Sequence, residues 1–144
     1  LGLEVFLKTS GGKGIHIVVP LTRRARWDEV KDFSHAIVDY LANLFPDRLS
    51  AVSGPKNRVG RIFIDYLRNG RGATAVAPYS TRARAGAPVS MPLSFDELSP
   101  QILPNHFTVA NVPARLAESD GDPWEDFRSA EAPLQGKAKS KTRR

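Results

Sequence analysis

A short glycine-rich stretch near the start of the sequence has the residue types that bind phosphate groups. Within residues 10–14, three glycines in four positions let backbone N–H groups approach an anion, while Ser10 adds a hydroxyl and Lys13 a cation. His16 follows two residues later, within side-chain reach of anything that the stretch holds. The Walker A spacing of the common phosphate-binding loop is missing. The stretch therefore predicts either an anion-binding loop or an ordinary tight turn, with His16 as a ligand contact or a structural histidine.

Asp65 is the acidic residue with the most unusual surroundings. It lies within the apolar run Ile62-Phe63-Ile64-Asp65-Tyr66-Leu67, which predicts a strand over 61–67. An ionised carboxylate inside a buried strand is costly unless a metal ion or an arginine such as Arg68 or Arg71 compensates it. The alternative is an aspartate on the solvent-facing side of a half-buried strand, and the pattern leaves both interpretations open.

Basic residues gather around this acid. The whole chain of 144 residues has a net charge of +6, but residues 54–84 alone contain seven lysines and arginines against the single Asp65. Arginine suits bidentate recognition of phosphate, and phosphate together with a divalent metal ion would explain both the arginines and the carboxylate. A solvated basic surface is the alternative explanation.

Regular elements must position these residues. Strands are predicted over 4–9 and 15–19, joined by the glycine-rich stretch as a hairpin. Apolar residues spaced by three and four predict an amphipathic helix over 27–44, with His35 on its solvated face. A further short strand is predicted over 74–77, followed by an irregular proline-rich segment over 78–104. Short helices are predicted near 94–98, 108–117 and 123–129. Asp122 is the expected N-cap of the last of these helices.

Composition excludes several classes of protein. The chain has no cysteine, so a disulfide scaffold, a cysteine zinc site and a thiol nucleophile are ruled out. No apolar run reaches the length of a membrane span, and the N-terminal residues do not have the pattern of a signal peptide. We therefore expect a cytoplasmic protein. Because Leu1 is not a start methionine, we also expect the chain to be part of a longer protein.

Two segments resemble a known family in the same order. Residues 6–16, Phe-Leu-Lys-Thr-Ser-Gly-Gly-Lys-Gly-Ile-His, resemble the second motif of the polymerase domain of bacterial ligase D, the multifunctional enzyme of non-homologous end joining. Residues 63–69 resemble the third motif of that domain, and residues 72–80 together with Arg82 resemble the segment that follows it. Pro92-Leu93 and Phe95-Asp96-Glu97-Leu98 continue the similarity. The domain belongs to the archaeo-eukaryotic primase superfamily.

The resemblance implies an α+β fold in which a twisted, mainly antiparallel sheet is flanked by helices. It implies a nucleotidyltransferase that adds nucleotides, often ribonucleotides, to DNA ends in double-strand break repair. The implied cofactors are two Mg²⁺ or Mn²⁺ ions, with Asp65 as the catalytic carboxylate and metal ligand. The implied nucleotide-binding residues are Ser10, Lys13, His16, Arg68 and Arg82, and the implied DNA-binding residues are Lys56 and Arg58.

The resemblance also implies partners: nucleoside triphosphates, DNA ends, a ligase domain in the same polypeptide and the Ku end-binding protein, in the cytoplasm at the bacterial nucleoid.

One departure from the family pattern is important. The first motif of the family, an Asp-x-Asp pair that supplies the other metal ligands, does not precede Ser10, and Asp120-Gly121-Asp122 comes too late in the sequence to replace it. We therefore expect residues 1–131 to be the C-terminal part of the domain, inactive alone, and residues 132–144 to be a basic disordered tail or linker. A non-catalytic nucleic-acid-binding module is the alternative.

Overall fold

The computed structural model of the chain describes residues 1–134. These residues divide into two compact units. The first combines Leu1–Arg23 with the described residues from Val76 onward, and the second is Arg24–Ala75. Most of the expected tail lies outside the described residues, but Ala132 is described and forms a parallel bridge with Leu21.

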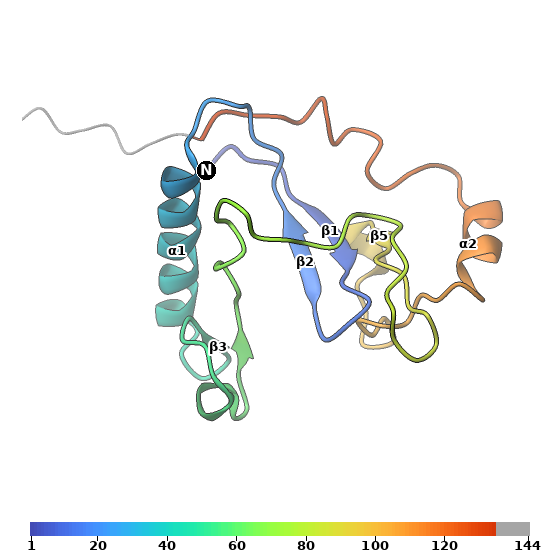
Figure 1. Cartoon of the computed structure of the whole chain (residues 1–144), viewed down its shortest axis with the longest axis horizontal. Coiled ribbons are helices and arrows are strands. Elements are labelled where there is room, and N and C mark those ends of the chain that lie inside the picture. The colour runs from blue at the N-terminus through green and yellow to red at the C-terminus, as the bar shows by residue number, and fades with distance from the viewer. Residues whose placement is uncertain (135–144) are drawn as a thin grey trace, which may run out of the picture. The chain divides into compact units, whose positions relative to one another are not determined.

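A three-stranded antiparallel sheet organises the first unit (Figure 1). Its strands, in the spatial order β2-β1-β5, are β1 (Phe6–Thr9), β2 (Ile15–Val18) and β5 (Pro92–Leu93). β1 and β2 form the predicted hairpin, with Lys8 opposite His16. β5 was not predicted because it is only two residues long and includes a proline; it pairs with β1 through Leu7 and Leu93. The antiparallel sheet with helices confirms the α+β class.

The apolar core of the first unit lies on one face of this sheet. Leu7 and Leu93 are opposite each other in the register and share a face, where they cluster with Met91 and Phe107. Each of these four side chains is at most 5% exposed. Because side chains alternate along a strand, Lys8 points away from Leu7, toward the opposite face of the sheet.

Short helices follow β5 in the chain. The 3₁₀ helix η2 (Phe95–Glu97) and the helix α2 (Val112–Glu118) lie within or close to two of the predicted helical segments. Arg115 on α2 forms an ion pair with Glu97, and its guanidinium lies 4.7 Å from the centre of the Phe107 ring. Arg115 therefore connects both helices to the core.

The predicted helix over 123–129 is wrong. The segment forms consecutive turns, in which the Glu125 N–H donates to the Asp122 carbonyl and the Phe127 N–H to the Trp124 carbonyl. This turn geometry stacks the Trp124 and Phe127 rings with their centroids 5.0 Å apart, and the Phe6 ring on β1 forms a T-shaped contact with each of them. Packing against β1 therefore takes precedence over the local helical pattern.

The second unit contains the predicted long helix, α1 (Trp27–Leu44) (Figure 1). The helix is followed by a two-stranded parallel pair, β3 (Leu49–Ser50) with β4 (Ile62–Phe63), and the 3₁₀ helix η1 (Pro55–Arg58) lies between the two strands in the chain. His35 is only half-exposed, because its ring stacks on Tyr66 with the centroids 4.0 Å apart. This stack ties α1 to the segment after β4.

Two predicted strands are shorter or absent. The strand predicted over 61–67 ends at Phe63, because the Asp65 carboxylate accepts a hydrogen bond from the Leu67 N–H and turns the chain. The segment 74–77 forms no strand, since the carbonyls of Thr74 and Val76 accept hydrogen bonds from the side chains of Arg68 and Lys8. Side-chain donors and acceptors replace ladder hydrogen bonds in both places.

Within residues 1–134, neither helix is both long and apolar enough to cross a lipid bilayer.

Candidate functional site

The turn between β1 and β2 is held in shape by Ser10. The Ser10 hydroxyl oxygen accepts hydrogen bonds from the N–H groups of Gly12 and Gly14, both at 3.1 Å, and the Ser10 N–H donates to the Gly14 carbonyl. The Gly11 N–H donates to the Pro104 carbonyl at 2.9 Å. Four backbone donors of the turn are thus used inside the protein. Ser10 orders the turn, and its own hydroxyl hydrogen is the group that can donate to a ligand.

Gly11 is the position in this turn that requires glycine. Its φ of +62° is unfavourable for any residue with a side chain. A Cβ atom at this position would lie 2.8 Å from Cγ of Arg82 and 3.4 Å from the Pro88 carbonyl oxygen. The absence of a side chain at Gly11 therefore lets the segment that carries Arg82 pack directly against the turn.

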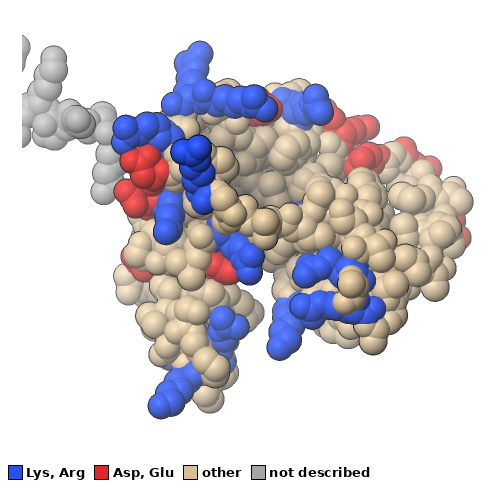
Figure 2. All heavy atoms as spheres, in the orientation of Figure 1, with Lys and Arg blue, Asp and Glu red and all other residues tan. Residues whose placement is uncertain are grey.

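Two arginines flank the turn. The Arg82 guanidinium donates to the Ser10 carbonyl at 2.9 Å, and a Cβ atom on Gly12 would lie 3.7 Å from Cζ of Arg84. Lys13 is exposed at the tip of the turn. Figure 2 shows basic side chains gathered over this end of the β1–β2 hairpin. We call the turn together with Arg82, Arg84 and Lys13 the anion site, because its charges and donors suit a polyphosphate.

Sequence reasoning assigned five residues to nucleotide binding: Ser10, Lys13, His16, Arg68 and Arg82. Four of them lie at one end of the first unit, whereas Arg68 belongs to the second unit. Arg84 was noted only as part of the basic cluster, although it is two residues from Arg82 and thus at the spacing that places side chains on one side of an extended chain. His16 is half-buried on β2.

A buried lysine lies beneath this site. Lys8 on β1 is 3% exposed and lies opposite His16 in the hairpin register, so that both residues belong to the same face of the sheet. Its ammonium group donates to the Ser90 hydroxyl at 3.0 Å and to the Val76 carbonyl. Burial and the nearby Arg82 charge lower the pKa of Lys8 to about 8. Sequence reasoning missed this residue, because lysines are rarely buried in proteins.

Asp65 belongs to the second unit and is exposed, not buried within a strand. Its Oδ1 atom accepts from the Leu67 N–H at 2.9 Å, which leaves Oδ2 as the oxygen available to a ligand. The neighbouring Tyr66 ring is fixed by its stack on His35. Of the two interpretations that the sequence left open, the structure supports the solvent-exposed aspartate, although Asp65 lies two residues beyond the end of β4 and not on the strand itself.

A complete metal site is not present within residues 1–134. No three or more His, Cys, Asp or Glu side chains in this range form a cluster that could hold an ion. Asp65 offers a single carboxylate, whereas Mg²⁺ or Mn²⁺ needs several oxygen ligands. The described residues therefore fit one ligand of such a site and not the whole site.

The other predicted residues of the second unit lie on its surface. Arg68 is exposed, and its guanidinium donates to the Thr74 carbonyl at 3.1 Å. Lys56 and Arg58 belong to η1 and are both exposed. The Arg58 guanidinium lies 4.7 Å from the centre of the Phe63 ring, a cation–π contact that gives this side chain a preferred direction. η1 thus carries two exposed cationic side chains, and the contact with Phe63 orients the one of Arg58.

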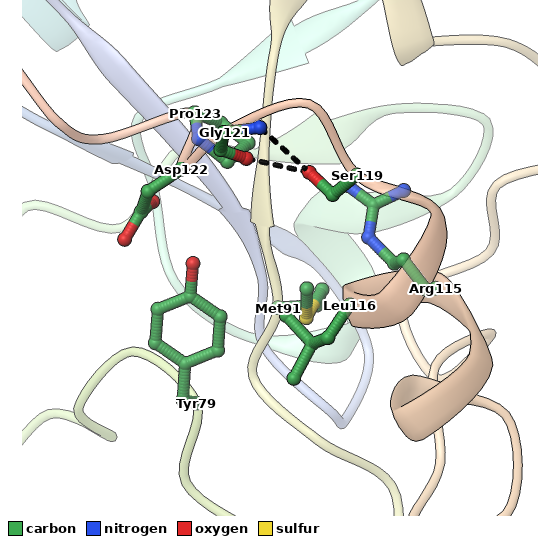
Figure 3. Close-up of a pocket in the computed structure, with 8 residues that line it drawn as sticks. All are labelled: Tyr79, Met91, Arg115, Leu116, Ser119, Gly121, Asp122 and Pro123. Atoms are coloured by element: carbon green, nitrogen blue, oxygen red, sulfur yellow. Dashed lines mark hydrogen bonds between the residues drawn. The ribbon is translucent and has the colours of Figure 1, made fainter.

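A second candidate site in the first unit is a hollow of about 410 Å³ (Figure 3). Tyr79 and Asp122 face each other across it, and burial together with the Asp122 carboxylate raises the pKa of the Tyr79 phenol to about 12. The one arginine in its lining, Arg115, is paired with Glu97. With its cation neutralised and a carboxylate in the wall, the hollow suits an anion less well than the anion site.

Known proteins resemble this chain over most of its length. A family model described as "LigD, primase-polymerase domain" matches residues 1–124. The multifunctional non-homologous end joining protein LigD of Pseudomonas aeruginosa is 59% identical over 128 residues, which are 88% of this chain and 15% of that protein. The bifunctional LigD of Bacillus subtilis is 34% identical over 127 residues, 88% of this chain and 21% of that protein. The chain thus spans about a fifth or less of these relatives.

A solved structure has the same fold. The polymerase domain of Mycobacterium tuberculosis ligase D, in complex with DNA, superposes with a TM-score of 0.79 at 30% sequence identity. The match covers 92% of this chain and 45% of that chain.

Proposed function

The chain belongs to the LigD primase-polymerase domain family, and from this premise we propose that it binds the incoming nucleoside triphosphate in a domain that adds nucleotides to DNA ends. The intact protein would act in non-homologous end joining, as the names of its relatives indicate for them. DNA ends, a ligase domain in the same polypeptide and the Ku protein would be its partners, at the nucleoid of a bacterial cell.

The anion site is the observation that carries this proposal. An ordered turn with Arg82 and Arg84 beside it and Lys13 at its tip offers several cationic donors to one ligand. A nucleoside triphosphate carries its charge on adjacent phosphates, so that a short array of guanidinium and ammonium groups can bind it at several points. His16 and the Ser10 hydroxyl would complete the contacts from the hairpin.

Asp65 would supply one ligand to the Mg²⁺ or Mn²⁺ ions that such a domain uses. When bound, the ions would activate the primer hydroxyl and stabilise the leaving pyrophosphate. The remaining carboxylates would come from outside this chain, since the Asp-x-Asp pair of the family is absent from it. We therefore propose that the chain alone does not extend a primer.

DNA would contact η1 of the second unit. Lys56 and Arg58 are exposed there, and the Phe63 ring holds the Arg58 guanidinium in place. The related polymerase domain that was solved with DNA supports a DNA-binding role for this chain. Arg68 would add a further phosphate contact.

Binding of a nucleoside triphosphate is the direct test of this function. We expect the full-length protein to bind fluorescently labelled ATP in the presence of Mg²⁺, and Arg82→Gln to weaken this binding about tenfold, because one charge-assisted contact is lost. Arg128→Gln, at an exposed arginine of the same unit, is the matched control and should bind like the unchanged protein.

The same titration separates the proposed enzyme from a non-catalytic nucleic-acid-binding module. Such a module would bind labelled single-stranded DNA with steep salt dependence and would not bind the triphosphate. Absence of ATP binding, or equal binding by Arg82→Gln and Arg128→Gln, would overturn the proposed function.

A further inference from the structure

Lys8 is buried at a position where the packing alone does not require a lysine. It occupies the centre of the four-residue strand β1 and is 3% exposed. A buried ammonium group is costly unless it is hydrogen-bonded, and here its acceptors are the neutral Ser90 hydroxyl and Val76 carbonyl. Within residues 1–134 no acidic side chain forms an ion pair with Lys8, so this buried charge calls for an explanation beyond packing.

The two acceptors of Lys8 lie at the two ends of one segment. Residues 76–90 leave β1 near Val76 and return to it at Ser90, and the Ser90 hydroxyl also donates to the Thr9 carbonyl at 2.8 Å. The ends of the segment are paired with each other, since the Tyr79 N–H donates to the Ser90 carbonyl at 2.7 Å. Lys8 thus closes the base of a loop.

This loop carries the arginines of the anion site. The Arg82 N–H donates to the Pro88 carbonyl at 2.7 Å, and Pro88 is in turn close to Gly11. The Arg82 guanidinium reaches the Ser10 carbonyl, two residues beyond Lys8 on the same strand. Both the base of the loop and the Arg82 side chain are therefore hydrogen-bonded to the short stretch from Lys8 to Ser10.

The charges of Lys8 and Arg82 act on each other. The Arg82 guanidinium adds to the effect of burial in lowering the pKa of Lys8 to about 8, so that the two cations repel each other when no anion is bound. A polyphosphate at the anion site would offset this repulsion. A polyphosphate bound by Arg82 therefore stabilises the arrangement in which Lys8 holds the loop next to β1.

We propose that Lys8 is a positioning residue that ties both ends of the loop 76–90 to β1 and thereby holds Arg82 against the anion site for binding of a nucleoside triphosphate. This inference rests on the proposed function and deepens it. It assigns Lys8 no contact with the reacting atoms. Its effect on the ligand passes through Arg82.

A double-mutant cycle tests whether Lys8 acts through Arg82. The probe is ATP with MgCl₂, bound to the full-length protein, and the variants are Lys8→Met, Arg82→Gln and the two combined. We expect each single substitution to weaken ATP binding about tenfold, and the double variant to bind about as weakly as Arg82→Gln alone. Lys31→Met, at an exposed lysine of α1, is the control and should leave ATP binding unchanged.

The outcomes distinguish the inference from the function on which it rests. If the two losses multiply to about a hundredfold, or if Lys8→Met binds ATP as well as Lys31→Met does, the positioning role of Lys8 is wrong and the proposed function stands. If Arg82→Gln binds ATP as tightly as the unchanged protein, both the positioning role of Lys8 and the proposed function are wrong. Should Lys8→Met fail to fold, Ser90→Ala replaces it in the cycle; this variant removes one acceptor of Lys8 and is expected to weaken binding about threefold, again without further loss in the Arg82→Gln background.

Discussion

Replacing Asp65 with asparagine is expected to lower primer extension by the full-length protein about a thousandfold while leaving its stability unchanged. Asparagine keeps the size of the side chain and the oxygen that accepts from the Leu67 N–H, so that the turn after β4 is preserved. It removes only the negative charge. Because Asp65 is exposed, this loss should not change the free energy of unfolding by more than about 0.5 kcal/mol.

The control for this prediction is Asp32→Asn, at an exposed aspartate of α1 in the same unit. It should extend a primer at the rate of the unchanged protein. Binding of ATP to Asp65→Asn should be retained in part, since the anion site belongs to the first unit. Equal extension rates for Asp65→Asn and Asp32→Asn would show that Asp65 is not a metal ligand.

Gly11→Ala is expected to destabilise the protein by about 2 kcal/mol and to weaken ATP binding roughly thirtyfold. Alanine would adopt a left-handed φ of +62°, and its Cβ atom would meet Cγ of Arg82 at 2.8 Å. The substitution would therefore displace Arg82 and distort the turn together. Urea unfolding and ATP titration measure the two effects.

Gly14→Ala is the matched control for Gly11→Ala. It lies in the same turn, its φ is not positive, and no atom lies within 4 Å of the position that its Cβ would take. If both alanine variants have the same stability in urea and the same affinity for ATP, the close packing of Arg82 against the turn is not what shapes the anion site.

The elements predicted well from sequence are those with a strong local signal. Apolar residues at helical spacing predicted α1 from Trp27 to Leu44, and glycines between two β-branched runs predicted the β1–β2 hairpin. The strand over 61–67 was predicted too long, because Asp65 uses its carboxylate to turn the backbone. The predicted helix over 123–129 failed because Trp124 and Phe127 pack on Phe6 in a turn geometry that a local pattern does not record.

The anion site was predictable in part. The family resemblance implied a nucleotide site of Ser10, Lys13, His16, Arg68 and Arg82, of which all but Arg68 lie in the first unit. The structure adds that Ser10 orders the turn through the N–H groups of Gly12 and Gly14. Lys8 was not predictable, because its role depends on acceptors 68 and 82 residues away in the chain. Long-range hydrogen bonds of this kind leave no periodic signal in a sequence.

Hydrogen exchange of the full-length protein, with and without a non-hydrolysable ATP analogue, tests most directly whether the anion site binds the nucleotide. The backbone amides of Gly11, Gly12 and Gly14 already donate hydrogen bonds inside the protein, so that a ligand that rigidifies the turn should slow their exchange further. We expect added protection at residues 10–14 and 82–84, and none at residues 54–60. Unchanged exchange at the turn, with protection confined to 54–60, would contradict the account.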